Sequence, residues 1–180
     1  MGGVAIVQEF NVIFREVQRS RQWWLWLTLV SGTVFAVVIF AYGIIEQIVL
    51  HRPFGSNPMS DTALVTTAVL VVLLMVVLDA LFLGANLVTE VRPDGLHIRY
   101  FPFHLSFRRI PLENVTKVEA VTYSPIRDYG GWGIRWARTG KAYNPTGDRG
   151  VRIHYADGRH ILIGSQRPEE LAQAVQSVMH

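Results

Sequence analysis

The stretch Ala68-Val-Leu-Val-Val-Leu-Leu-Met-Val-Val-Leu78 decides the architecture of this 180-residue chain. It forms the middle of an apolar run over residues 62–89, in which Asp79 is the one Asp, Glu, Lys or Arg. A helix of that length extends about 40 Å at roughly 1.5 Å per residue, and the hydrocarbon core of a bilayer is about 30 Å thick. The run therefore predicts a transmembrane helix over residues 62–89.

Another apolar run precedes it. Residues 22–45 are 24 consecutive residues without a formal charge, and they predict a transmembrane helix over residues 22–46. The connection, residues 47–61, contains Pro53 and Pro58 and is predicted to be a short, turn-rich loop. Together the two runs predict a transmembrane hairpin.

Positive charges near the ends of the two runs predict how the hairpin is oriented. Cytoplasmic flanks of transmembrane helices carry an excess of Lys and Arg. Arg52 is the one Lys or Arg in the connecting loop, whereas both outer flanks contain several. We therefore expect a multi-pass protein of the cell membrane, with an extracytoplasmic loop and with both termini in the cytoplasm. The flanking residues are Arg15, Arg19 and Arg21 before the hairpin, and Arg92, Arg99, Arg108 and Arg109 after it.

The N-terminal residues 1–21 show a helical spacing of apolar side chains. These side chains fall at i, i+4, i+7, i+8 and i+11, which places them on one face of a helix. We interpret the segment as a cytoplasmic amphipathic helix on the inner membrane surface. Packing against the C-terminal domain is the alternative. The apolar residues are Ile6, Phe10, Ile13, Phe14 and Val17.

Asp79 is an ionisable residue inside a predicted membrane helix. A carboxylate at that depth costs a few kcal/mol, so such residues are often functional. In an antiparallel hairpin, Thr28 or Ser31 would lie at a similar depth and could donate a hydrogen bond to it. A structural hydrogen bond, a protonated acid or a contact in a homo-oligomer would each explain Asp79.

Residues 91–180 form the predicted cytoplasmic domain. Apolar and polar residues alternate there with a period of two, which is typical of half-buried β-strands. The pair Asp157-Gly158 separates two alternating runs and predicts a β-hairpin. Pro168 begins an amphipathic segment and predicts a C-terminal helix. The fold class is therefore predicted as α+β: the transmembrane hairpin, followed by an antiparallel β-sandwich or partly open barrel closed by a C-terminal helix.

Several motifs in this domain resemble a known family. The stretches are Asp94-Gly-Leu-His-Ile-Arg-Tyr100, Arg109-Ile-Pro-Leu-Glu-Asn-Val-Thr-Lys-Val-Glu119 and Asp157-Gly-Arg-His-Ile-Leu-Ile-Gly-Ser-Gln-Arg-Pro-Glu-Glu-Leu171. They resemble bacterial pleckstrin-homology-like domains. The whole chain is similar to uncharacterised prokaryotic membrane proteins that carry such a domain after a two-helix hairpin. The resemblance implies a fold and a membrane location, and it implies no activity.

A basic and aromatic segment is the predicted ligand-contact region. Arg donates bidentate hydrogen bonds to phosphate, and Trp prefers the boundary between water and an apolar phase. Such a segment suits an anionic lipid headgroup or a partner protein. The alternative is an edge hairpin with Trp side chains in the core and solvated Arg side chains. The candidate residues are Arg127, Trp132, Arg135, Trp136, Arg138, Lys141 and Arg149.

Other classes of function find little support in the sequence. The chain has no cysteine, and its six histidines lack the spacing of metal ligands, so neither metal nor cofactor is expected. From Val91 onward there are 13 Lys and Arg against eight Asp and Glu, an excess too small to indicate nucleic-acid binding. We expect a non-enzymatic, membrane-anchored binding or scaffold module. The alternatives are a subunit of an oligomeric channel or transporter, and an uncharacterised enzyme.

Overall fold

A computed structural model describes residues 11–19, 23–137 and 140–179 of the chain. The chain divides into two compact units. The hairpin unit comprises residues 22–84, and the sheet unit comprises residues 1–21 together with residues 85–180. The N-terminal segment therefore belongs to the same unit as the C-terminal domain, although the hairpin separates them in sequence.

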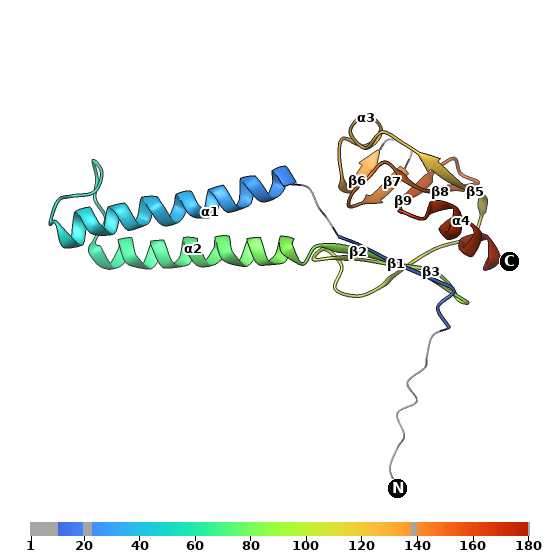
Figure 1. Cartoon of the computed structure of the whole chain (residues 1–180), viewed down its shortest axis with the longest axis horizontal. Helices are drawn as coiled ribbons and strands as arrows, with labels where there is room; N and C mark the ends of the chain where they lie inside the picture. Colours follow the sequence, from blue (N-terminus) through green and yellow to red (C-terminus); the bar gives the residue numbers. More distant parts are fainter. Residues whose placement is uncertain (1–10, 20–22, 138–139, 180) are drawn as a thin grey trace, which may run out of the picture. The chain divides into compact units, whose positions relative to one another are not determined.

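The hairpin unit consists of two long helices (Figure 1). Helix α1 spans Trp23–Ile44 and continues into the π-helical turn η1, Ile45–Val49, and helix α2 spans Asp61–Leu83. Both helices are long and apolar enough to cross a membrane. The Ser60 hydroxyl caps α2 by accepting a hydrogen bond from the Ala63 N–H at 3.3 Å.

Helix α2 ends six residues before the predicted end of the apolar run. Gly84 is its C-cap, and strand β2, Asn86–Arg92, begins two residues later. The hydropathy of the run did not reveal this boundary because residues 84–89, which include the first four residues of β2, carry no charge. A short uncharged segment at a strand start cannot be told from the end of a helix by periodicity alone.

The first sheet joins the two ends of the hairpin. Strands β1 (Phe14–Arg19), β2, β3 (Gly95–Phe101) and β4 (Arg108–Ile110) lie in the order β1-β2-β3-β4, and each neighbouring pair is antiparallel. Arg19 is the register partner of Asn86, and Asn86 is the register partner of Phe101. The hairpin is therefore inserted between two strands that are hydrogen-bonded neighbours.

The predicted N-terminal helix is wrong where the structure describes it, because Phe14–Arg19 is strand β1. Phe14 points into the core, whereas Ile13 and Val17 point outward and are 49% and 52% exposed. Pairing with β2, some 70 residues away in sequence, overrides the helical spacing. Ile6 and Phe10 lie outside the described residues.

Polar side chains fix β1 to the segment before the last helix. Glu16 is a buried residue, 8% exposed. Its carboxylate accepts hydrogen bonds from the Ser165 hydroxyl at 2.6 Å and the Gln166 N–H at 2.7 Å. Gln18 donates to the Gly164 carbonyl at 2.6 Å. Buried polar groups that are paired in this way specify one position for the strand.

The second sheet has the order β5-β8-β9-β7-β6. Its strands are β5 (Val115–Thr122), β6 (Gly133–Ala137), β7 (Gly140–Asn144), β8 (Arg149–Tyr155) and β9 (His160–Gly164). The predicted hairpin at Asp157-Gly158 is confirmed as β8–β9. The expectation of an entirely antiparallel domain is wrong, because β7 and β9 pair in parallel. Neither sheet of the described residues closes into a barrel.

Two helices complete the sheet unit. The short helix α3, Pro125–Tyr129, was not predicted, and the C-terminal helix α4, Pro168–Ser177, confirms the prediction at Pro168. Helix α4 contacts β5 and β8 of one sheet and β1 and β2 of the other. Its buried Leu171 and Val175 join apolar residues of both sheets in one core. The fold is therefore α+β, with one core between two sheets and α4.

Candidate binding site

The sheet unit has a partly open pocket of about 410 Å³ where β6, β7 and β9 meet the segments around Pro111 and Tyr155. Its position depends on the parallel pairing of β7 with β9, which makes Lys141 the register partner of Ile161. A Cβ atom at Gly140 would collide with the carbonyl oxygen of His160, so this pairing requires glycine there. The lining residues are Pro111, Trp136, Ala137, Gly140, Lys141, Tyr155, Arg159, His160 and Ile161.

Lys141 is the cation of this pocket that aromatic rings hold in place. Its Nζ lies 4.8 Å from the centre of the Trp136 ring and 4.7 Å from the centre of the Tyr143 ring. Among the described residues, no carboxylate forms an ion pair with Lys141. Cation–π contacts position an ammonium group without neutralising its charge. Lys141 can therefore still bind an anion.

Trp136 gives the pocket an apolar wall. The Trp136 residue is 73% exposed, which is unusual for a large aromatic side chain in a folded domain. It is the register partner of Lys141 in the β6–β7 ladder. A ligand that contacts both side chains would meet a positive charge beside an apolar surface.

The other polar groups of the pocket already have partners. The Arg159 guanidinium lies 2.6 Å from the Asp157 carboxylate, and this hydrogen bond lowers the pKa of Asp157. The Tyr155 hydroxyl donates to the Pro111 carbonyl at 2.8 Å, and burial raises the pKa of Tyr155 to about 12. Arg159 and Tyr155 therefore shape the pocket, and Lys141 is its unpaired charge among the described residues.

His160 connects the pocket to a polar cluster on the outer face of the second sheet. Its Nε2 lies 2.9 Å from the Tyr129 hydroxyl, and the His160 and His154 ring centres are 6.1 Å apart. Burial lowers the pKa of His160, and the positive charge of Arg152 lowers it further. A neutral His160 accepts the Tyr129 hydrogen bond and adds no charge to the pocket.

The predicted contact residues separate into two groups. Trp136 and Lys141 come together in the pocket. The other described residues are engaged elsewhere, and Arg138 lies outside the described residues. Two of them form ion pairs: Arg127 with Asp128 at 3.2 Å, and Arg149 with Glu169 at 2.6 Å. The other two donate hydrogen bonds to the backbone: Trp132 Nε1–H to the Gly147 carbonyl at 2.9 Å, and Arg135 Nε to the Trp132 carbonyl at 2.8 Å.

Sequence reasoning missed the side of the pocket that β9 supplies. Arg159, His160 and Ile161 follow the Asp157-Gly158 turn and were predicted only as part of a hairpin. They reach Lys141 through the parallel pairing of β7 with β9. No local pattern in the sequence indicates this pairing, because it joins residues some 20 positions apart.

Asp79 has a partner inside the hairpin unit, and it differs from the predicted ones. The Thr33 hydroxyl donates to Asp79 Oδ2 at 2.7 Å. Thr28 instead donates to the Trp24 carbonyl and Ser31 to the Thr28 carbonyl. The prediction placed the partner by counting turns from the helix ends. Packing of buried residues, among them Ala36 on α1 and Ala68 on α2, sets the register of the two helices instead.

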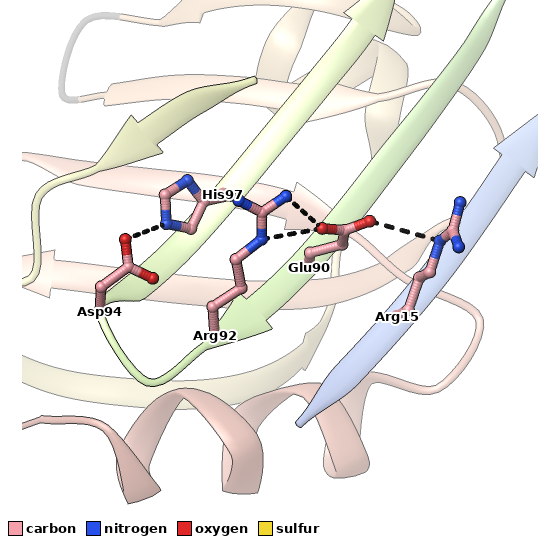
Figure 2. Close-up of polar contacts among 5 residues, drawn as sticks. All are labelled: Arg15, Glu90, Arg92, Asp94 and His97. Atoms are coloured by element: carbon pink, nitrogen blue, oxygen red, sulfur yellow. Dashed lines mark hydrogen bonds and ion pairs between the residues drawn. The ribbon is translucent and has the colours of Figure 1, made fainter. Parts of the chain in front are cut away.

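A further polar network lies on the outer face of the first sheet, and Figure 2 shows Glu90 between Arg92 and Arg15. The Glu90 side chain is 7% exposed, accepts from Arg92 Nε at 2.9 Å, and lies 3.3 Å from Arg15 Nε. His97 Nε2 lies 3.1 Å from Asp94 Oδ2 (Figure 2). Because these charges neutralise one another across β1, β2 and β3, the network suits a structural role better than anion binding.

Comparison with known proteins gives a family without an assigned activity. The model of a family of unknown function, DUF6141, matches residues 7–180. No curated protein gives a significant match. Since the match covers nearly the whole chain, the protein belongs to the DUF6141 family.

Proposed function

We propose that this protein is a membrane-anchored, non-enzymatic binding module whose pocket at Trp136 and Lys141 takes the anionic headgroup of a lipid. In this proposal the two helices span the cell membrane, and both termini are cytoplasmic. The resemblance of the sheet unit to pleckstrin-homology-like domains stays a prediction.

The charges that flank the helices support the orientation. Arg15 and Arg19 precede α1, Arg92 and Arg99 follow α2, and the loop between the helices carries only Arg52. The sheet register supports an even number of crossings, because β1 before the hairpin pairs with β2 after it. A Ser56→Cys variant tests the orientation, since the chain has no other cysteine. An impermeant maleimide should label it from outside intact cells.

The single observation that carries the ligand assignment is the position of Lys141 Nζ, less than 5 Å from two ring centres and without an ion-pair partner among the described residues. An ammonium group held in this way binds phosphate as a point charge. The apolar surface of Trp136 beside it suits the glycerol and first methylene groups of a lipid. A free phosphate ion would interact with the Lys141 ammonium group and not with the apolar surface of Trp136.

Two observations favour a binding module over the alternatives. Asp79 is bonded to Thr33 within one hairpin, so its presence does not require a pore lined by several copies. In the pocket, the Tyr155 hydroxyl donates to a backbone carbonyl, and among the described residues no base forms a hydrogen bond with it.

The test is ligand binding by the full chain in nanodiscs made of zwitterionic lipid. Dihexanoyl phosphatidic acid is the probe, and dihexanoyl phosphatidylcholine and inorganic phosphate are the comparison ligands. We expect Lys141→Gln to weaken binding of the anionic lipid about tenfold, as for loss of one charge-assisted contact of about 1.5 kcal/mol. Trp136→Ala should weaken binding of the lipid more than binding of phosphate, because it removes the apolar surface together with one of the two rings that position Lys141 Nζ.

Lys117→Gln is the matched control, because Lys117 is the other lysine of the chain and pairs with Glu119 on β5, outside the pocket. This variant should bind like the wild type. Equal losses in both variants would mean that only the net charge matters, and an unchanged Lys141→Gln would refute the pocket assignment. Binding of an acidic peptide in place of the lipid would assign the pocket to a partner protein.

A further inference from the structure

The loop between β3 and β4, residues 102–107, exposes two large apolar side chains. Phe103 is 59% exposed and Leu105 is 79% exposed, the highest value for any large apolar residue in the described part of the chain. Arg108 and Arg109 follow, and residues 102–109 contain no Asp or Glu. An apolar tip followed by two arginines is the composition expected of a segment that enters a lipid headgroup layer.

This loop is fixed to the sheet unit by residues next to the exposed ones. His104 is 6% exposed, its N–H donates to the Tyr100 carbonyl at 2.8 Å, and its ring lies against the Tyr143 ring. The Phe107 ring lies under the Arg92 guanidinium, 4.8 Å from it. Because the loop is held at both points, Phe103 and Leu105 are presented outward as a fixed feature.

The strand register places this loop beside the exit of the chain from α2. Phe101, the last residue of β3, is the register partner of Asn86, the first residue of β2. Helix α2 ends at Leu83, three residues before Asn86. Three residues extend at most about 10 Å. If α2 crosses a membrane, this short covalent connection limits how far Asn86 can lie from the surface at which α2 ends, whatever the angle between the two units.

We propose that Phe103 and Leu105 insert into the interfacial region of the bilayer that the protein's own hairpin spans. The inference rests on the proposed function in one respect, namely that the two helices cross the membrane. Insertion places Arg108 and Arg109 at the level of the lipid phosphates, where a basic side chain is favoured. It also brings the pocket to the headgroups, because His104 contacts Tyr143 and the Tyr143 ring lies 4.7 Å from Lys141 Nζ. The ligand then comes from the same bilayer.

The test uses single cysteines, which are unique labels because the chain contains none. A Leu105→Cys variant is labelled with an environment-sensitive fluorophore and reconstituted in vesicles that contain lipids with a nitroxide on the acyl chain. Leu73→Cys, on the exposed face of α2, reports whether the hairpin is inserted. Pro93→Cys is the matched control in the turn at the other end of β2 and β3, about 20 Å along the strands.

We expect strong quenching at positions 73 and 105 and weak quenching at position 93. Adding Phe103→Asp to the Leu105→Cys variant should lower the quenching at 105 towards the value at 93, whereas adding Phe103→Leu should preserve it. Circular dichroism and thermal melts confirm that each labelled variant is folded.

The failures of the two proposals are distinguishable. Weak quenching at position 73 would refute the spanning hairpin. Strong quenching at 73 with equal, weak quenching at 105 and 93 would overturn the insertion of the loop alone. A label at 105 that is shielded from water but not quenched by the acyl chains would assign the loop to a protein contact, and it would also overturn the proposal.

Discussion

Replacing Glu16 tests whether the N-terminal strand is an integral part of the sheet unit. The Glu16 carboxylate accepts hydrogen bonds from the Ser165 hydroxyl at 2.6 Å and from the Gln166 N–H at 2.7 Å, and the residue is buried. A Glu16→Ala variant leaves both donors without this acceptor. Hydrogen bonds to a charged group contribute about 1.5–3 kcal/mol each, so we expect a loss of about 3 kcal/mol once water replaces part of them.

The assay is the thermal melt of the full chain in nanodiscs, followed by the β-sheet signal in circular dichroism. A loss of about 3 kcal/mol should lower the midpoint by roughly 10–20 °C for a domain of about 100 residues. A Glu16→Gln variant keeps one carbonyl acceptor and should lose about half as much. If the two helices span the bilayer as proposed, they remain in the lipid and contribute a constant background.

Glu113→Ala is the control for this prediction. The Glu113 side chain is 64% exposed and lies 3.6 Å from the Arg109 guanidinium, so its loss should cost less than about 1 kcal/mol. If the Glu16→Ala and Glu113→Ala variants have the same melting midpoint, β1 is not anchored through the segment 164–167. The assignment of β1 to the sheet unit would then lose its main energetic support.

Three further predictions test other features of the two units. Replacing residues 20–85 by Asn-Gly should give a soluble, folded protein by size-exclusion chromatography and circular dichroism, because Arg19 and Asn86 are register partners that a two-residue turn can connect. A fragment that starts at Val91 lacks β1 and most of β2 and should not fold. Thr33→Val should destabilise the hairpin by about 1 kcal/mol in a detergent titration, and Thr28→Val should not, because the Thr33 hydroxyl donates to Asp79 whereas the Thr28 hydroxyl donates to the Trp24 carbonyl. Burial and the charge of Arg152 lower the pKa of His160, so the unfolded chain binds a proton at this residue more readily than the folded one. The sheet unit should therefore lose stability as the pH falls below the ordinary histidine value of 6.5. His160→Gln should flatten this dependence in melts between pH 7 and pH 5.

The helices were predictable because their signal is local. A run of 24 residues without charge is visible in the sequence, and the described helix α1, Trp23–Ile44, lies within it. The hairpin at Asp157-Gly158 and the helix after Pro168 are equally local and were found. Helix α3 had a local signal that was overlooked. Ser124 caps it, Pro125 begins it, and the Asp128 carboxylate accepts a hydrogen bond from the Ser124 N–H at 2.9 Å.

The candidate site was only partly predictable because pairings between distant segments build it. Trp136 and Lys141 face each other within one β-hairpin and were identified from composition. Arg159, His160 and Ile161 reach them through a parallel ladder that no sequence pattern announces. The same reason explains why a helix was wrongly predicted for residues 14–19. Strand β1 forms because it pairs with β2, a segment distant in sequence.

The inserted hairpin constrains the topology of the protein independently of its charges. Strand β1 ends at Arg19 and strand β2 begins at Asn86, and these two residues are partners in one antiparallel ladder. A backbone ladder cannot form across a bilayer, because its strands must lie in one compartment to bond to each other. If α1 and α2 span a membrane, both flanks of the hairpin therefore lie on the same side, and the distribution of arginines has only to decide which side that is. The order of assembly follows as well, since β1 cannot pair until β2, which follows both helices in sequence, has been synthesised. Translation arrested before Asn86 should therefore leave β1 unpaired and sensitive to protease.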